Sequence, residues 1–88
     1  MRLGVLKEPD GENRVSLIPN SYKKLNKLGF ELTVESGAGV ISHYSDNEYQ
    51  SAGFTVSDKT SVLESEIVVS ISTPDLSNAK EGQIFVCI

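Results

Sequence analysis

The sequence predicts an α/β domain in which helices flank a mostly parallel β-sheet. Short apolar runs alternate with amphipathic or capped segments along the 88-residue chain. This alternation is typical of a parallel sheet with crossover helices. The run Ile67–Ile71 is almost entirely apolar, as expected for a strand that is covered on both faces. A chain of this length forms one domain or part of one.

The first half of the chain is expected to form a strand, a helix and a second strand. Arg2–Leu6 is a short, mostly apolar run and predicts the first strand. Pro19 suits the first turn of a helix, which runs to about Leu28 and ends at Gly29. The alternating segment Phe30–Val34 predicts the second strand. The helix is expected to pack one stripe of side chains, formed by Tyr22, Leu25 and Leu28.

The second half continues the alternation with shorter elements. Ser45 or Asp46 is expected to cap a helix that ends near Ala52, before Gly53. The later elements expected are the strand Phe54–Val56, the helix Lys59–Ser65 capped by Ser57 or Asp58, the strand Ile67–Ile71, a break at Pro74 and a buried strand at Gln83–Ile88.

Composition and charge argue against several classes of protein. The net charge of −4 argues against a nucleic-acid binder, which usually carries a basic face. No run approaches the roughly 20 apolar residues of a membrane span, so no direct membrane insertion is expected. The single cysteine, Cys87, cannot form an intrachain disulfide, fits a reducing cytoplasm and is expected to be an inert buried thiol. Because the sequence ends within the apolar run Phe85–Ile88, we expect residues 1–88 to be an incomplete N-terminal α/β subdomain of a longer protein.

The segment Gly37-Ala38-Gly39 partly matches the G-x-G-x-x-G fingerprint of dinucleotide-binding proteins. Asp58 even lies about 20 residues further on, where that fingerprint places an acidic residue. The third glycine is replaced by Ser42, however, and the loop follows the second strand instead of the first. We therefore interpret Gly37 and Gly39 as parts of a structural turn and regard them as weak candidates for cofactor binding.

Charged residues follow the first strand and are the candidate ligand-facing groups. Lys7, Glu8 and Arg14 come directly after it, where open α/β sheets place their ligand sites. The Arg14 guanidinium suits two-pronged binding of a carboxylate or phosphate, or it pairs with Glu8 or Glu12 in its own loop. His43 is expected to be a surface residue. No metal site is expected, because His43 has no ligand partners at short spacing.

Taken together, several segments resemble one family, the alanine dehydrogenases and the proton-translocating NAD(P) transhydrogenase α subunits. The resemblance covers essentially the whole chain and is closer to the transhydrogenase α subunit. Its strongest parts are the Glu-x-Arg-Val segment and the Val-Glu-Ser-Gly-Ala-Gly loop. The segments that carry it are Met1–Val5, Lys7-Glu8, Glu12–Val15, Pro19, Leu28–Phe30, Val34–Gly39, Ala52-Gly53 and Ser65–Val68.

The resemblance implies a Rossmann-like (flavodoxin-like) subdomain that forms one wall of the nicotinamide cleft, with Arg14 facing that cleft. The dinucleotide fingerprint would lie in a second subdomain beyond Ile88, so the 88-residue chain alone is expected to be inactive and to bind no cofactor tightly. The intact enzyme would use NAD(H) and NADP(H). Its partners would be the rest of the α subunit, a second copy in a homodimer, and the membrane-embedded and NADP-binding transhydrogenase subunits. It would be cytoplasmic and peripheral to the inner membrane.

Two alternatives to a transhydrogenase α subunit remain open from the sequence, an alanine dehydrogenase and a non-catalytic module. In the alanine dehydrogenases of this family, the arginine matching Arg14 and a lysine two residues before the proline matching Pro74 hold the pyruvate carboxylate. The lysine position is Ser72 here, which favours the transhydrogenase branch over an alanine dehydrogenase. The third possibility is a non-catalytic α/β interaction module that recruits a strand at an open sheet edge.

Overall fold

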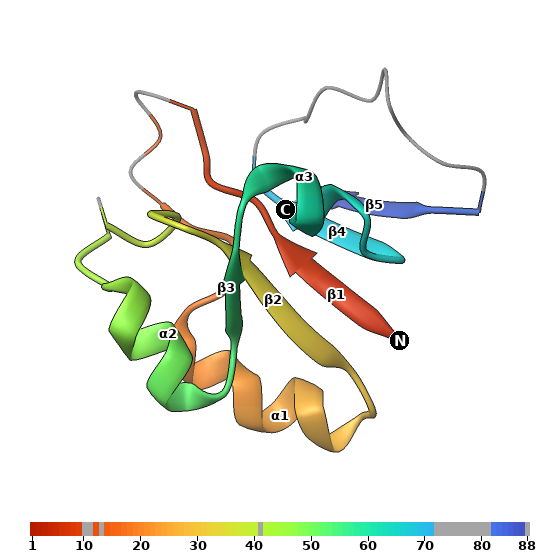
Figure 1. The fold of residues 1–88 in the computed structure, drawn as a ribbon, viewed down its shortest axis with the longest axis horizontal. Coiled ribbons are helices and arrows are strands. Elements are labelled where there is room, and N and C mark those ends of the chain that lie inside the picture. Colours follow the sequence, from red (N-terminus) through yellow and green to blue (C-terminus); the bar gives the residue numbers. More distant parts are fainter. Residues whose placement is uncertain (10–11, 13, 41, 72–81, 88) are drawn as a thin grey trace.

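The protein forms a parallel β-sheet with helices on both faces, as the computed structural model in Figure 1 shows. The structure describes residues 1–9, 12, 14–40, 42–71 and 82–87. Every strand pair is parallel and the strand order is β3-β2-β1-β4-β5. The strands are β1 (Arg2–Val5), β2 (Glu31–Glu35), β3 (Thr55–Ser57), β4 (Ile67–Ser70) and β5 (Ile84–Cys87). The predicted α/β fold class is confirmed.

Successive strands are added on one side of β1 up to β3 and then on its other side from β4 onward. The order is that of the first five strands of a Rossmann sheet. Without the short edge strand β3, the remaining order β2-β1-β4-β5 is also that of the first four strands of a flavodoxin-like sheet. Both descriptions place the topological switch point between the paired strands β1 and β4, because the chain adds strands on one side of β1 first and later returns to build β4 on the other side.

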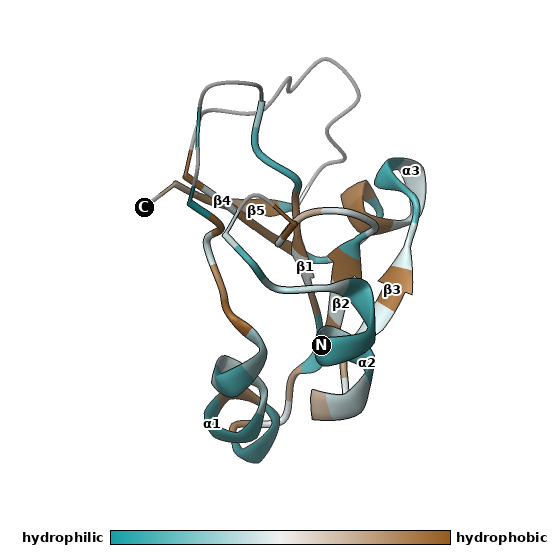
Figure 2. Cartoon of the chain, turned by 90° about the vertical axis from the view of Figure 1, so that its left-hand side faces the viewer, coloured by the Kyte–Doolittle hydropathy of each residue, from teal (hydrophilic) through white to brown (hydrophobic). Residues whose placement is uncertain are grey.

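Two hydrophobic clusters fill the two faces of the sheet. The first contains Val5, Val34 and Tyr49 and receives side chains from α1 and α2. The second contains Leu6, Val62 and Val68 and lies beneath α3. Figure 2 shows the hydrophobic colour concentrated on the strands and the hydrophilic colour on α1 and α2. The helical segments are η1 (Pro19–Ser21), α1 (Tyr22–Lys27), α2 (Asp46–Ala52) and α3 (Lys59–Leu63).

Two expectations about burial are wrong. Leu28 lies just past the end of α1 and its side chain is 73% exposed, because the α-helix is too short to place it on the buried stripe. β5 is an edge strand in the described part of the chain and pairs with β4 only, so Val86 and Cys87 are exposed. The break expected at Pro74 lies outside the described residues.

The start of α2 follows local sequence signals closely. The Ser45 side chain accepts the Glu48 backbone N–H at 3.2 Å, and the Glu48 side chain reaches back to the backbone of Ser45. This reciprocal capping box satisfies two N–H groups that the first turn of a helix leaves without partners. At the other end, Gly53 adopts a φ of 124°, which a residue with a side chain rarely does.

We expect Ser45→Ala to destabilise the protein by about 1 kcal/mol, because it removes the side-chain half of the capping box. Urea unfolding followed by circular dichroism would measure this loss. Ser51→Ala, at an exposed position inside the same helix, is the matched control and should be nearly neutral. Equal effects of the two substitutions would show that the cap contributes nothing beyond helix propensity.

Candidate functional site

The carboxyl ends of β1, β2 and β4 lie side by side and form the candidate site. The paired register places Val5 beside Val34 of β2 and Val69 of β4. The residues that leave these strands therefore emerge at one edge of the sheet, which we call the carboxyl edge. Its topological switch point lies between β1 and β4, and crevices at such points are where open α/β sheets bind ligands.

Lys7 leaves β1 toward β2. Its backbone N–H donates to Glu35 Oε1 at 2.9 Å, and Glu35 is the last residue of β2. The Lys7 side chain is exposed and passes near the loop after β2, since a Cβ added at Gly37 would lie 3.8 Å from Lys7 Nζ. Lys7 thus places an exposed positive charge at the carboxyl edge, while Glu35, which the sequence did not single out, holds its backbone.

Glu8 leaves β1 toward β4 and is buried, with 7% of its surface exposed. Its Oε2 accepts the backbone N–H of Ile71 at 2.8 Å. Ile71 directly follows β4, so this hydrogen bond crosses the switch point. The sequence suggested both Lys7 and Glu8 as ligand-facing groups, whereas the structure connects the Lys7 backbone to β2 and buries the Glu8 side chain against the end of β4.

Arg14 pairs with Glu12 instead of standing free. Its Nε donates to Glu12 Oε1 at 2.9 Å and its Nη2 donates to Glu12 Oε2 at 3.1 Å. The hydrogen bonds and the charge of Glu12 raise the pKa of the Arg14 guanidinium, and the charge of Glu8 adds to this effect. The Arg14 side chain is 73% exposed. Of the two partners that the sequence suggested, the structure shows Glu12, in the two-pronged geometry that a ligand carboxylate would take.

The Gly37 loop is held by a carboxylate of the chain itself. Asp46 Oδ1 accepts the Gly37 N–H at 2.9 Å and Asp46 Oδ2 accepts the Ser36 hydroxyl at 2.7 Å. Gly39 is needed for packing, because a Cβ there would lie 2.6 Å from the Tyr49 ring. In a dinucleotide fingerprint the corresponding N–H groups face a pyrophosphate at a helix N-terminus. Here Asp46 occupies the Gly37 N–H, which favours the interpretation as a structural turn.

The remaining candidates lie apart from this edge or outside the description. His43 is exposed, as expected, and has a φ of 68° in the loop between β2 and α2. Within the described ranges, no three His, Cys, Asp or Glu residues are arranged to hold a metal ion. None of the helices described is long and apolar enough to cross a membrane. Ser72 and Pro74 lie outside the described residues.

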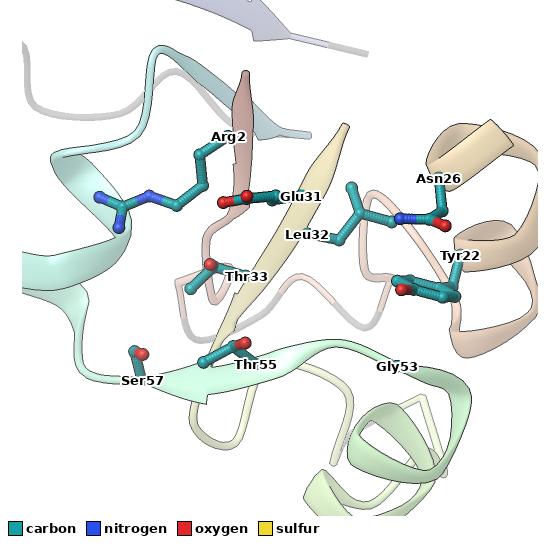
Figure 3. Close-up of a pocket in the computed structure, with 9 residues that line it drawn as sticks. All are labelled: Arg2, Tyr22, Asn26, Glu31, Leu32, Thr33, Gly53, Thr55 and Ser57. Atoms are coloured by element: carbon teal, nitrogen blue, oxygen red, sulfur yellow. The ribbon is translucent and has the colours of Figure 1, made fainter. Parts of the chain in front are cut away.

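A polar hollow of about 290 Å³ runs along β2 and β3 (Figure 3). Thr33, Thr55 and Ser57 contribute hydroxyl groups, and Tyr22 lies on the opposite side of the hollow. Arg2 also lines it, but Arg2 Nη2 donates to the Ser61 carbonyl at 3.3 Å and Arg2 Nε is buried without a partner among the residues described. The Arg2 guanidinium is therefore turned toward α3.

The fold defines an α/β domain whose carboxyl edge contains a topological switch point, the place where open α/β sheets bind ligands. The family can be stated more narrowly. Residues 4–88 match the family described as alanine dehydrogenase/PNT, N-terminal domain, and the chain belongs to this family.

Relatives of both branches are similar to the chain. It is 35% identical to an NAD(P) transhydrogenase subunit alpha of Cereibacter sphaeroides, over 98% of the chain and 18% of the relative. It is 36% identical to an alanine dehydrogenase of Staphylococcus haemolyticus, over 96% of the chain and 24% of the relative. The crystal structure of transhydrogenase from Sinorhizobium meliloti superposes with a TM-score of 0.93 at 32% identity, over 100% of the chain and 28% of that structure. An L-alanine dehydrogenase structure gives a TM-score of 0.83 at 29% identity, over 97% and 25%. The chain thus spans between 18% and 28% of the length of these relatives, which are oxidoreductases.

Proposed function

We propose that this chain is the N-terminal domain of an NAD(P) transhydrogenase α subunit. The intact enzyme transfers hydride between NAD(H) and NADP(H) and couples this transfer to proton movement through membrane-embedded partner subunits. The α subunit is cytoplasmic, peripheral to the inner membrane and dimeric. The 88-residue chain alone has no activity and binds no dinucleotide tightly, because the fingerprint lies in a later subdomain.

The observation that carries the proposal is the closer match of the fold to the transhydrogenase structure, which extends over the whole chain. The sequence adds a chemical reason, since Ser72 stands where an alanine dehydrogenase of this family needs a lysine. A hydroxyl group cannot replace the charge that such a site uses to hold a substrate carboxylate. Two dinucleotides exchanging a hydride require no carboxylate site at that position.

In this function the carboxyl edge is one wall of the nicotinamide cleft. Arg14 faces the cleft with Glu12 orienting its guanidinium plane. Lys7 contributes a solvent-exposed positive charge, and Glu8 joins the two sides of the switch point. The domain supplies shape and charge to the wall and no part of the hydride chemistry itself, which belongs to the nicotinamide rings.

One observation favours a second candidate, an alanine dehydrogenase. Arg14 is exposed at the carboxyl edge, and its guanidinium already holds a carboxylate in two-pronged geometry, that of Glu12. A substrate carboxylate could replace Glu12 there, because an exposed ion pair is worth only about 0 to 1 kcal/mol. This candidate requires a second positive group to substitute for the lysine that is missing at Ser72.

Two parallel assays of the full-length protein, assembled with its membrane and NADP-binding partner subunits, test the proposal. The first follows reduction of an NADP analogue by NADH, and the second follows NADH formation from alanine and NAD. We expect activity in the first assay and none in the second. Alanine-dependent NADH formation without transfer between the dinucleotides would overturn the proposal and identify the second candidate.

A further inference from the structure

The buried carboxylate of Glu8 is the feature of the carboxyl edge that calls for an explanation. Glutamate is almost never fully buried unless it is paired or hydrogen-bonded. Glu8 is only 7% exposed, although it follows β1 in a segment where Lys7 and Pro9 are exposed. The side chain is therefore turned inward at a place where turning outward to water was available.

The inward turn of Glu8 connects segments that are far apart in the sequence. Glu8 follows β1 and Ile71 follows β4, and Glu8 Oε2 accepts the Ile71 N–H at 2.8 Å. A second connection reinforces the first, because the Ser16 hydroxyl donates to the Val69 carbonyl at 3.3 Å. The segment that carries Arg14 is thus fastened to the end of β4 on both sides, through Glu8 before it and Ser16 after it.

We propose that Glu8 is a positioning residue, whose carboxylate holds the chain after β1 at a fixed separation from Ile71, directly after β4, across the switch point. This inference rests on the proposed function, in which Arg14 faces the nicotinamide cleft. Removing one partner of a buried hydrogen bond costs free energy, because the group left behind has neither water nor protein to pair with. A buried bond of this kind restrains the backbone where a parallel sheet would otherwise open into a crevice.

The restraint predicts a specific kinetic effect. In the proposed function the dinucleotides are held mainly by other parts of the enzyme, so releasing the wall leaves their binding largely intact. A wall displaced by about 1 Å no longer fixes the orientation of the nicotinamide ring that lies against it, and a misplacement of that size can cost about 100-fold in rate. Loss of the Glu8 contact should therefore lower kcat much more than it raises KM.

Kinetics of the full-length, assembled enzyme test this with Glu8→Ala and Glu8→Gln. Glu66→Ala is the matched control, because the Glu66 carboxylate also accepts a backbone N–H, that of Arg2, but at the opposite edge of the sheet. We expect Glu8→Ala to lower kcat about 10- to 100-fold with KM for NADH changed less than about threefold. Glu8→Gln keeps a carbonyl oxygen that accepts the Ile71 N–H and should retain kcat within about threefold. Glu66→Ala should leave kcat unchanged.

Three kinetic results would overturn the inference. The first is a Glu8→Ala enzyme whose kcat matches that of Glu66→Ala, which would leave Glu8 with a role in folding alone. The second is a loss confined to KM, which would make Glu8 part of a binding surface. The third is a Glu8→Gln enzyme as slow as Glu8→Ala, which would show that the charge and not the acceptor matters.

Amide hydrogen exchange separates this inference from the proposed function. In Glu8→Ala the Ile71 N–H should exchange at least about tenfold faster than in wild type, while Glu66→Ala should leave its rate unchanged. This readout does not depend on which reaction the enzyme catalyses. If alanine oxidation is the activity found, the proposed function fails and Glu8 is judged by its effect on kcat for alanine. Unchanged exchange at Ile71 in Glu8→Ala overturns the inference whatever the activity is.

Discussion

Gly4→Val is expected to destabilise the protein by at least about 3 kcal/mol, because side-chain atoms at this position overlap the backbone of α3. A Cβ added at Gly4 would lie 2.7 Å from the Val62 carbonyl oxygen, 2.6 Å from Ser65 Oγ and 2.9 Å from Val62 Cγ1. The carbonyl oxygen belongs to the helix backbone and cannot rotate away. The larger side chain must therefore push α3 off the sheet or distort β1.

Gly4→Ala separates this steric effect from the ordinary effect of replacing a glycine. A glycine that gives way to alanine without strain usually stabilises a protein by about 0.4 to 1 kcal/mol. Gly4→Ala should instead destabilise, since the Cβ alone already overlaps Val62 and Ser65. Gly29→Ala is the contrasting control, because nothing lies within 4 Å of its added Cβ and only its φ of +96° causes strain.

Thermal unfolding followed by circular dichroism would rank these variants. For a domain of this size each kcal/mol shifts Tm by about 4 to 8 °C, so Gly4→Val should lower Tm by more than about 10 °C. Gly4→Ala should lie between Gly4→Val and wild type. A Gly4→Ala variant as stable as wild type would show that α3 is not packed against β1 as closely as the structure has it.

The elements that the sequence predicted well are those fixed by their own neighbours. The helix α2 begins at Asp46 because Ser45 and Glu48 form a capping box, and it ends before Gly53. Asp58 likewise caps α3, accepting the Ser61 N–H at 2.9 Å. Signals within four residues of one another suffice in these cases, since caps and stops act through local backbone hydrogen bonds.

The elements that the sequence predicted poorly depend on distant parts of the chain. An apolar strand such as β5 is buried only if another layer covers it, and its own residues do not show whether one does. Leu28 was expected on a buried stripe, but α1 ends one residue before it. The partner of Glu8 lies 63 residues away, and no spacing rule connects Glu8 with Ile71. The sequence therefore offered Glu12 as a partner of Arg14, as the structure has it, but did not predict that Glu8 is buried or that it accepts the Ile71 N–H.

The tyrosine at the centre of the first cluster links the core to the Arg14 segment. Tyr49 is fully buried, and its hydroxyl donates to the Leu17 carbonyl at 2.8 Å. Its ring packs edge-on against Phe54, with centroids 5.1 Å apart. Burial raises the pKa of Tyr49 to about 12, with further contributions from Tyr44, Asp46 and Glu48. The folded protein therefore holds the Tyr49 proton more tightly than the unfolded chain, in which tyrosine titrates near 10.

This difference in proton affinity predicts that Tyr49 causes a loss of stability at alkaline pH. Its contribution is complete below pH 10, where both states are protonated. Above pH 10 the unfolded chain loses the proton first, so stability falls by up to about 1.4 kcal/mol per pH unit until the folded state also titrates near pH 12. The total loss is about 3 kcal/mol, because each unit of pKa difference corresponds to about 1.4 kcal/mol.

Tyr49→Phe should therefore change the sign of its effect with pH. At pH 8 we expect it to destabilise by about 1 to 2 kcal/mol, because the Leu17 carbonyl loses its donor. At pH 12 the variant should be the more stable protein, because it lacks the group whose ionisation favours unfolding. Urea unfolding from pH 8 to pH 12 should then give curves that cross between pH 10 and 12. Phe54→Leu loosens the same ring contact without removing an ionisable group. It should lower the free energy of unfolding by the same amount at every pH. A constant difference between Tyr49→Phe and wild type across this range would mean that the Tyr49 hydroxyl titrates alike in the folded and unfolded states.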